Sequence, residues 1–213
     1  MDAHQYDLAN PFGMDADCRN CPALVDCRER VVHGYGDVGA DFVFVGEAPT
    51  AGAERTGVPF TGDEHGRRVQ RVLGELGFSR SPPDAAEPEL RNCYLTYLTR
   101  CRHPERAASD EEVRNCEPFL NAELRSINPE IIVPVGGRAL RELAVEYTTR
   151  APESFSPDAS DEHATTVRGR GFELVPMVAP ADLDADRTAS FLEHLRESVL
   201  SRDYRQTKGR RSR

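Results

Sequence analysis

Six cysteines are the residues whose type and spacing most directly indicate chemistry in this chain. Cys18 and Cys21 form a CxxC pair in a loop that also holds proline and arginine. Cys101 follows an expected strand, and Cys116 lies in the expected helix after it. A CxxC pair lets two thiolates reach one metal centre from a single turn, and two more from distant segments complete a four-thiolate set. Such a set suits Zn²⁺ or an iron–sulfur cluster, and the spacing alone does not choose between them.

The two remaining cysteines leave alternatives open. Cys93 lies within an expected strand and is interpreted as a small buried core residue. Cys27 follows closely enough on Cys18 and Cys21 that these three could form a local three-thiolate set. Because the N-terminus shows no export signal, we expect reduced thiols, and metal or cluster binding is favoured over disulfides.

An alternation of strands and helices must position these thiols. The hydrophobic patterns predict, in chain order, strand 41–45, helix 66–76, strand 92–99, helix 110–126, strand 131–135, helix 137–147, strand 173–177 and helix 188–200. Ser109 and Glu112 form a capping box at the start of the second helix. The polar segment 151–170 is expected to be a loop. The alternation predicts a single α/β domain with a mostly parallel central sheet and helices on both faces, whose ligands bind at the carboxyl ends of the strands.

Composition narrows the class of protein. The 213 residues are 38% hydrophobic, which suits one core, and no apolar run approaches the length of a membrane span. We expect a cytoplasmic protein with no membrane association, in which residues 1–17 are flexible, 18–200 form the domain and 201–213 form a basic disordered tail. The net charge of −9 is unlike that of a typical nucleic-acid binder, although it does not exclude a local basic patch.

Three motifs, in this order along the chain, resemble those of the uracil-DNA glycosylase superfamily. The first is Gly46-Glu-Ala-Pro49 followed by Arg55-Thr-Gly-Val-Pro-Phe-Thr-Gly62, the second is Tyr94–Cys101 with its Cys101-Arg-His-Pro104 turn and Cys116, and the third is Asn128-Pro-Glu-Ile-Ile-Val-Pro-Val-Gly136. The match runs from about Cys18 to Leu200 and is closest to the thermostable iron–sulfur branches of the family 4 and family 5 kind. The resemblance implies a uracil-DNA glycosylase-like fold with an N-terminal cluster-binding loop.

The resemblance also implies a cofactor and a partner. The cofactor is a [4Fe–4S] cluster, and its ligands are Cys18, Cys21, Cys101 and Cys116. Cys27 and Cys93 are then spare cysteines. The partner is DNA that contains uracil or a damaged base, and we expect the protein to act as a monomer.

A glycosylase of this kind flips its target base out of the stack, sandwiches it against an aromatic ring and reads its edge. Phe60 is the implied stacking platform, although the same ring could simply anchor its loop. Backbone N–H groups of residues 46–49 could hold the uracil O2 as charge develops there. Glu47 could position the attacking water or stabilise the sugar cation, or could only cap a turn. The implied site residues are Glu47 and Glu54 for catalysis, and Gly46, Ala48, Pro49, Phe60, Tyr97, Ala179 and Pro180 for substrate binding.

The chain departs from the family pattern inside this pocket. Tyr97 stands where the family has the Asn that reads uracil, and Ala179 stands where it has a His. Thr50 replaces a usual Gly, and Ala53 replaces an acid, which leaves Glu54 one position away. Loss of one donor to the leaving-group oxygen typically costs ~10²–10³ in rate. A substitute imidazole could come from His33, His65, His103 or His163, of which His65 is nearest the pocket in sequence.

These departures leave more than one function open. The favoured function is a repair glycosylase that excises uracil or a related damaged base by hydrolysing the N-glycosidic bond. The alternative is a non-catalytic iron–sulfur paralogue that binds DNA with a disabled pocket. A redox carrier is less favoured because the sequence lacks a flavin or nicotinamide fingerprint.

Overall fold

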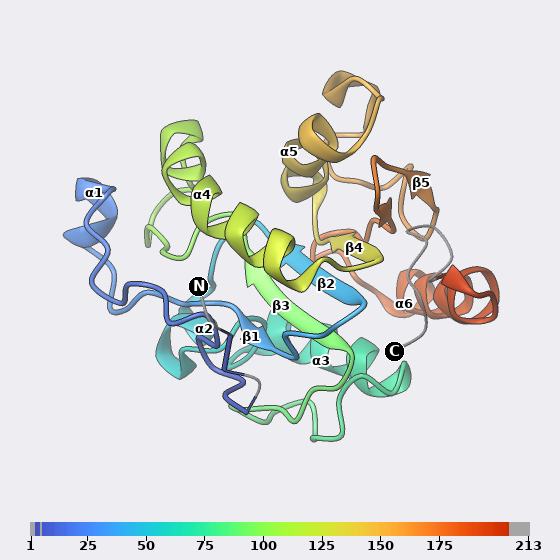
Figure 1. Ribbon diagram of the computed structural model, residues 1–213, viewed down its shortest axis with the longest axis horizontal. Helices are drawn as coiled ribbons and strands as arrows, with labels where there is room; N and C mark the ends of the chain where they lie inside the picture. Colours follow the sequence, from blue (N-terminus) through green and yellow to red (C-terminus); the bar gives the residue numbers. More distant parts are fainter. Residues whose placement is uncertain (1–2, 5, 205–213) are drawn as a thin grey trace.

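A six-stranded sheet forms the centre of the computed structural model, which describes residues 3–4 and 6–204 (Figure 1). The strands are β1 (Tyr35–Gly36), β2 (Phe42–Gly46), β3 (Cys93–Tyr97), β4 (Ile131–Pro134), β5 (Val167–Arg168) and β6 (Glu173–Leu174). They lie in the order β1-β3-β2-β4-β6-β5. The four inner strands are parallel, and the two edge strands β1 and β5 are antiparallel to their neighbours.

Helices connect these strands. They are α1 (Pro22–Val25), α2 (Ala51–Thr56), α3 (Glu64–Glu75), α4 (Asp110–Ile127), α5 (Gly137–Tyr147) and α6 (Ala185–His194), with a 3₁₀ turn at Pro152–Ser154 and a π-helical turn at Leu195–Leu200. The predicted capping box at Ser109 and Glu112 is present at the start of α4. Within the described part of the chain, no helix is long and apolar enough to cross a membrane.

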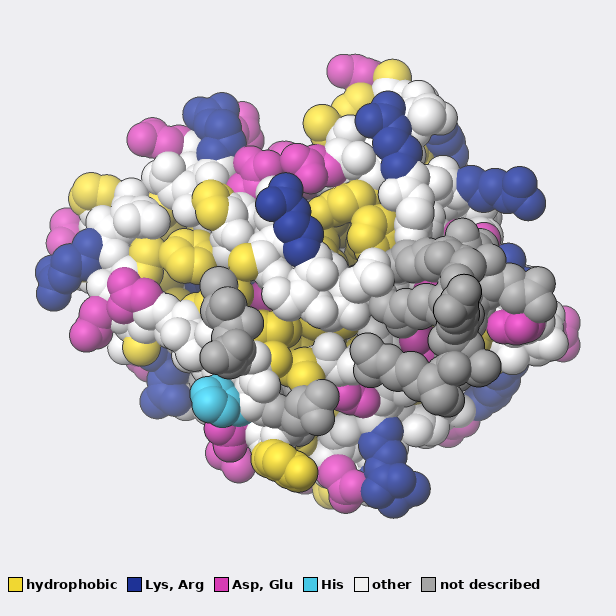
Figure 2. All heavy atoms as spheres, in the orientation of Figure 1, with side chains coloured by type: hydrophobic (Ala, Val, Ile, Leu, Met, Phe, Trp, Pro, Cys, Tyr) yellow, Lys and Arg dark blue, Asp and Glu magenta, His cyan; other side chains and the backbone are white. Residues whose placement is uncertain are grey.

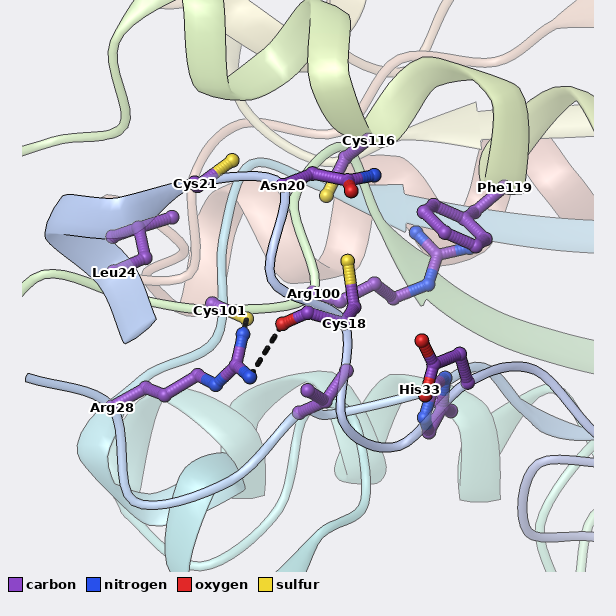
Figure 3. A pocket seen from close by; sticks show the side chains of 12 residues that line it. Cys18, Asn20, Cys21, Leu24, Arg28, His33, Arg100, Cys101, Cys116 and Phe119 are labelled. Atoms are coloured by element: carbon purple, nitrogen blue, oxygen red, sulfur yellow. Dashed lines mark hydrogen bonds between the residues drawn. The ribbon is translucent and has the colours of Figure 1, made fainter. Parts of the chain in front are cut away.

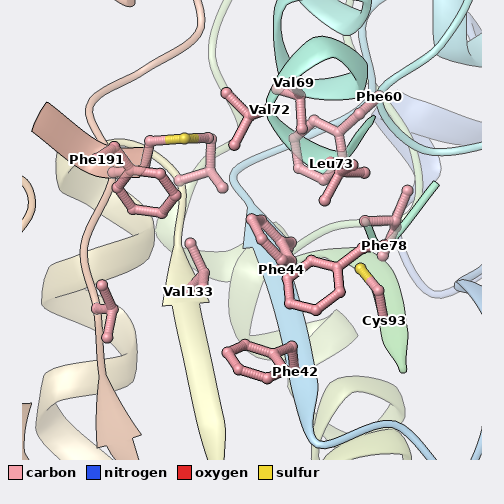
Figure 4. Close-up of a cluster of buried hydrophobic side chains, with 14 of the residues drawn as sticks. Phe42, Phe44, Phe60, Val69, Val72, Leu73, Phe78, Cys93, Val133 and Phe191 are labelled. Atoms are coloured by element: carbon pink, nitrogen blue, oxygen red, sulfur yellow. The ribbon is translucent and has the colours of Figure 1, made fainter. Parts of the chain in front are cut away.

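Side chains alternate along β2 between two hydrophobic cores, one on each face of the sheet. Phe42 and Phe44 point into the first core, which α3 and α6 cover (Figure 4). Val43 and Val45 point into the second core, which α4 and α5 cover. The structure therefore confirms a single α/β domain in which helices cover both faces of a mostly parallel sheet.

The sequence analysis does not predict α1, α2, β1 and β5, whereas β6, expected as a strand over 173–177, is present over only two residues. α2 has six residues, and its ends are set by the Thr50 cap and by Gly57 at φ +80°. β5 lies within the segment 151–170 that was expected to be a loop, and it pairs with β6 over only two residues. Elements this short are defined by caps and pairing partners, so a hydrophobic repeat cannot reveal them.

The N-terminal segment contributes to the second core. Phe12 and Met14 are only 3% and 7% exposed there. The flexibility expected for residues 1–17 stays a prediction. Of the basic tail expected over 201–213, residues 205–213 lie outside the described part of the chain.

Candidate functional site

A cleft of about 590 Å³ lies where β2, β3 and β4 reach their carboxyl ends. Seven of the predicted site residues line it, namely Gly46, Glu47, Ala48, Phe60, Tyr97, Ala179 and Pro180. This is the edge at which an open parallel sheet binds its ligands. Motifs that are far apart in sequence thus meet in one concave site.

Phe60 is held rigidly at the wall of this cleft. Its backbone adopts φ +55°, and its ring lies 4.8 Å from the ring of Tyr97. The Phe60 N–H donates to Tyr97 Oη at 2.8 Å, and Gln70 Nε2 donates to the Phe60 carbonyl at 3.1 Å. Phe60 thus lines the cleft and is also packed in the first core, where it is 5% exposed.

The Tyr97 side chain packs against the Phe60 ring and accepts a hydrogen bond from the Phe60 backbone. Burial raises the pKa of Tyr97 well above its ordinary value, so the hydroxyl stays protonated and its oxygen accepts the Phe60 N–H. A Cβ atom on Gly46 would lie 2.8 Å from both the Phe60 and the Tyr97 rings. Only glycine at position 46 therefore allows the two rings to pack over the end of β2.

The Tyr97→Phe variant tests this support. We expect a loss of about 1–3 kcal/mol in the free energy of unfolding, because the buried Phe60 N–H is left without an acceptor. Urea denaturation measures the change. The matched control is Tyr147→Phe, which removes a half-buried hydroxyl that donates to Asn121 at 3.2 Å and should cost less than about 1 kcal/mol. Equal losses in the two variants would contradict a supporting role for the Tyr97 hydroxyl.

Glu47 reaches the cleft from the end of β2, paired with an arginine that the sequence did not single out. Arg138 Nη1 lies 3.2 Å from Glu47, and Arg138 Nη2 lies 2.9 Å from Asp110. Arg138 lies in the first turn of α5 and Asp110 begins α4, so this guanidinium joins both helix starts to the Glu47 carboxylate. The side chain of Glu47 remains 36% exposed, which leaves it open to a ligand or water in the cleft.

A hydrogen bond to a histidine side chain holds the loop that carries Ala179. Val178 N–H donates to His163 Nδ1 at 3.2 Å, and His163 Nε2 lies 2.8 Å from the Arg187 carbonyl. Burial lowers the pKa of His163, which favours the neutral ring that this pair of contacts requires. Of the four histidines considered as substitutes for the missing imidazole, His65 lines the cleft.

Two predicted site residues do not line the cleft. Glu54 is 4% exposed, accepts the Glu29 N–H at 3.0 Å and lies 3.6 Å from Arg102. It therefore joins the loop after α1 to the turn after Cys101. Pro49 is buried beneath the cleft loop and is not among the lining residues.

A second cavity brings together the four predicted ligand cysteines. Cys18 and Cys21 come from the N-terminal loop, Cys101 follows β3, and Cys116 lies on α4 (Figure 3). Cys27 is not among the lining residues, and its Sγ lies 3.1 Å from the Ala23 carbonyl. The structure thus joins distant thiols, and it does not bring Cys27 into the same cavity.

Side-chain N–H groups point at two of these sulfurs. Arg28 Nη1 donates to Cys101 Sγ at 3.4 Å, and Asn115 Nδ2 donates to Cys21 Sγ at 3.6 Å. Burial raises the pKa of Cys101 to about 11, and it raises that of Cys116 against a hydrogen bond from the Arg100 backbone. Free thiolates are therefore disfavoured here, and a bound metal centre would supply the positive charge that stabilises them.

The donor set fits a cluster in its chemistry. Four thiols share one cavity, and N–H donors of the kind that orient thiolate ligands surround them. Among the described residues, no three His, Cys, Asp or Glu side chains are arranged to hold a metal ion. The thiols therefore line a common space without converging on one point.

A buried ion pair connects the cysteine cavity with the cleft. Arg100 Nη2 lies 2.6 Å from Glu123, and the two side chains are 3% and 1% exposed. Tyr94 and Thr96 donate to the same carboxylate at 3.0 Å and 2.8 Å. Arg100 lines the cysteine cavity and donates to the carbonyl of Tyr97, a cleft residue, at 2.7 Å. No pattern in the sequence signals this network.

Comparisons of the sequence with known proteins show which proteins this chain is similar to. The family model for the uracil DNA glycosylase superfamily matches residues 33–200. A type-5 uracil-DNA glycosylase from Pyrobaculum aerophilum is 30% identical over 206 residues, covering 87% of each chain. A type-5 enzyme from Thermus thermophilus is 37% identical over 174 residues, covering 72% of this chain and 78% of its own. A type-4 uracil-DNA glycosylase from Thermotoga maritima is 31% identical over 190 residues, covering 86% of this chain and 84% of its own.

Proposed function

Because the chain belongs to the uracil-DNA glycosylase superfamily, we propose that it excises uracil or a related damaged base from DNA by hydrolysing the N-glycosidic bond. The observation that carries this proposal is the cleft at the carboxyl ends of the parallel strands. There the 46–48 backbone, Glu47 and a rigidly held Phe60 face one space. A base-excising enzyme needs these three kinds of group together.

Each group has a role in this proposal. The flipped base stacks on Phe60, whose fixed backbone spares the cost of ordering the ring on binding. The N–H groups of residues 46–48 face the oxygen on which charge develops as the base departs. Glu47, oriented by Arg138, positions the attacking water or stabilises the positive charge on the sugar.

The cleft lining carries no net positive charge, because its two arginines lie beside Glu47, Asp158 and Asp182. Contacts to DNA phosphates are therefore expected from individual arginines, in a chain whose net charge is −9. Arg138 and Arg141 both line the cleft, and Arg141 donates to the Pro157 carbonyl at 2.6 Å. On the face shown in Figure 2, arginine side chains project singly among Asp and Glu. DNA binding is therefore expected to depend on the cleft and not on a broad basic surface. We further propose that the protein acts as a monomer in the cytoplasm.

We propose that Cys18, Cys21, Cys101 and Cys116 hold a [4Fe–4S] cluster. The shared cavity and the N–H donors to sulfur support this assignment. When bound, the cluster supplies cross-links among the N-terminal loop, the end of β3 and α4. Cys27 and Cys93 are not needed as ligands.

The proposed activity is tested by cleavage of uracil-containing oligonucleotides, single- and double-stranded, after alkali treatment. We expect slow excision, because Ala179 supplies no donor to the leaving-group oxygen. The comparison substrate is the same oligonucleotide with thymine in place of uracil. Tight binding without any excision at enzyme excess would instead favour the non-catalytic DNA-binding paralogue.

A further inference from the structure

Two buried N–H-bearing side chains on the wall of the cysteine cavity have atoms without a hydrogen-bond partner. Both ring nitrogens of His33 are buried, and neither has a partner among the described residues. Arg100 Nε is in the same position, although the rest of its guanidinium binds Glu123 and the Tyr97 carbonyl. Both side chains line the cavity that holds the four thiols (Figure 3).

An unpaired N–H of this kind is rare in a native interior. An imidazole carries at least one N–H in either protonation state, and a guanidinium Nε always carries one. Burying such a donor without an acceptor forfeits the hydrogen bond that it makes with water. Main-chain pairing also fixes the place of His33, because Val32 N–H donates to the Arg100 carbonyl at 2.8 Å. The backbone segments that carry these two donors are therefore hydrogen-bonded to each other in the wall of the cavity.

The cavity itself indicates what the acceptor is. Its lining holds four sulfurs, and two of them already receive side-chain N–H groups, from Arg28 and Asn115. The carboxylate of Asp15 also lines the cavity, but it makes no hydrogen bond to His33. The lining also holds the Asn20 amide, but the four sulfurs are the acceptors that a bound cluster would bring together in this cavity.

We propose that His33 and Arg100 Nε donate hydrogen bonds to the sulfur atoms of the bound cluster. This inference rests on the proposed [4Fe–4S] cofactor and adds two donors outside the ligand set. N–H donors to cluster sulfur stabilise the more negative, reduced state and raise the reduction potential. His33 is therefore a positioning and tuning residue for the cofactor, and it takes no part in base excision.

The test compares three variants of the full chain, purified anaerobically with the cluster in place. His33→Leu removes the donor at similar volume, and His33→Gln retains an N–H. His194→Leu is the matched control, because it removes another half-buried imidazole that does not line this cavity. The His194 Nε2 atom lies 2.9 Å from the Thr166 hydroxyl. The readouts are iron per chain, the rate of iron release to a chelator, and the midpoint potential from electrode titration.

We expect His33→Leu to shift the midpoint potential to more negative values and to release iron several-fold faster. His33→Gln and His194→Leu should both stay close to the wild type. Equal midpoint potentials in His33→Leu and the wild type, with iron retained in both, would overturn the proposed role of His33 but not the proposed cofactor. So would equal shifts in His33→Leu and His33→Gln, because packing would then explain them. A wild-type chain without iron would overturn the cofactor itself, whereas uracil excision on the same samples reports separately on the proposed activity.

Discussion

Replacing Cys116 with alanine is expected to strip the iron from the protein and to remove much of its solubility. Cys116 is the thiol that α4 contributes to the cysteine cavity, so its loss leaves three ligands for a cluster that takes four. The N-terminal loop, the end of β3 and α4 would then lose their common cross-link, and folding and metal binding are coupled in such sites. Cys18→Ala, Cys21→Ala and Cys101→Ala should behave in the same way.

Two other cysteines serve as matched controls for this prediction. Cys93 is fully buried in the first core, and Cys27 lies outside the lining of the cavity. Both alanine variants should keep the brown colour and about four irons per chain, as in the wild type. Iron analysis and visible absorption of anaerobically purified samples measure the outcome. Iron loss in Cys27→Ala but not in Cys116→Ala would reassign the ligands, and a colourless protein with one zinc would rule out the cluster.

The fold was largely predictable because burial leaves a strong pattern in the sequence. The apolar runs of β2 and β4 gave parallel strands buried on both faces, and Ser109 with Glu112 marked the start of α4. Caps and short pairings, such as β5 on β6, leave no repeat to detect. The sequence analysis identified the motifs that carry the candidate site residues, but it did not identify the side chains that hold those residues in place.

Glu54 shows where reasoning from sequence position fails. It was favoured because it lies one position from Ala53, where relatives of the thermostable branch have an acid. Both residues lie in α2, where consecutive side chains point about 100° apart, so a shift of one position changes the face of the helix. Glu54 accordingly meets Glu29 and Arg102 instead of the cleft.

Tyr97 shows a different limit. Strand alternation predicts that Thr96 and Tyr97 point to opposite faces of the sheet, and the structure places Thr96 against Glu123 and Tyr97 against Phe60. The contact with Phe60 spans 37 positions of sequence, and no local pattern encodes it. Tyr97, interpreted from the sequence as a replaced base-reading Asn, is thus a residue that holds Phe60 in place.

Ala179→His is expected to raise the rate of uracil excision by up to ~10²-fold, because it returns one donor to the leaving-group oxygen. Ala179 lines the cleft, and the adjoining loop is held by His163 at Val178 and by Arg68 at the Pro180 carbonyl. Gly136 lies opposite Ala179, and a Cβ atom on Gly136 would lie 3.6 Å from the Ala179 Cβ. Single-turnover assays on a uracil-containing oligonucleotide measure the gain.

The matched control is Ala181→His, which adds an imidazole two positions along on an exposed residue that does not line the cleft. It should leave the rate unchanged, since an imidazole acts only where it reaches the reacting oxygen. Adding Tyr97→Asn to Ala179→His supplies a carboxamide that pairs with the uracil edge in one orientation, so selectivity for uracil over thymine should increase. The same change removes the ring and hydroxyl that hold Phe60, so the free energy of unfolding should fall. If the wild type already excises uracil at an ordinary rate, catalysis must come from other groups, with His65 and Glu47 of the cleft first in line, and His65→Ala or Glu47→Gln should then lower the rate. No gain from Ala179→His in a chain that retains its cluster and binds uracil-containing DNA would favour the non-catalytic paralogue.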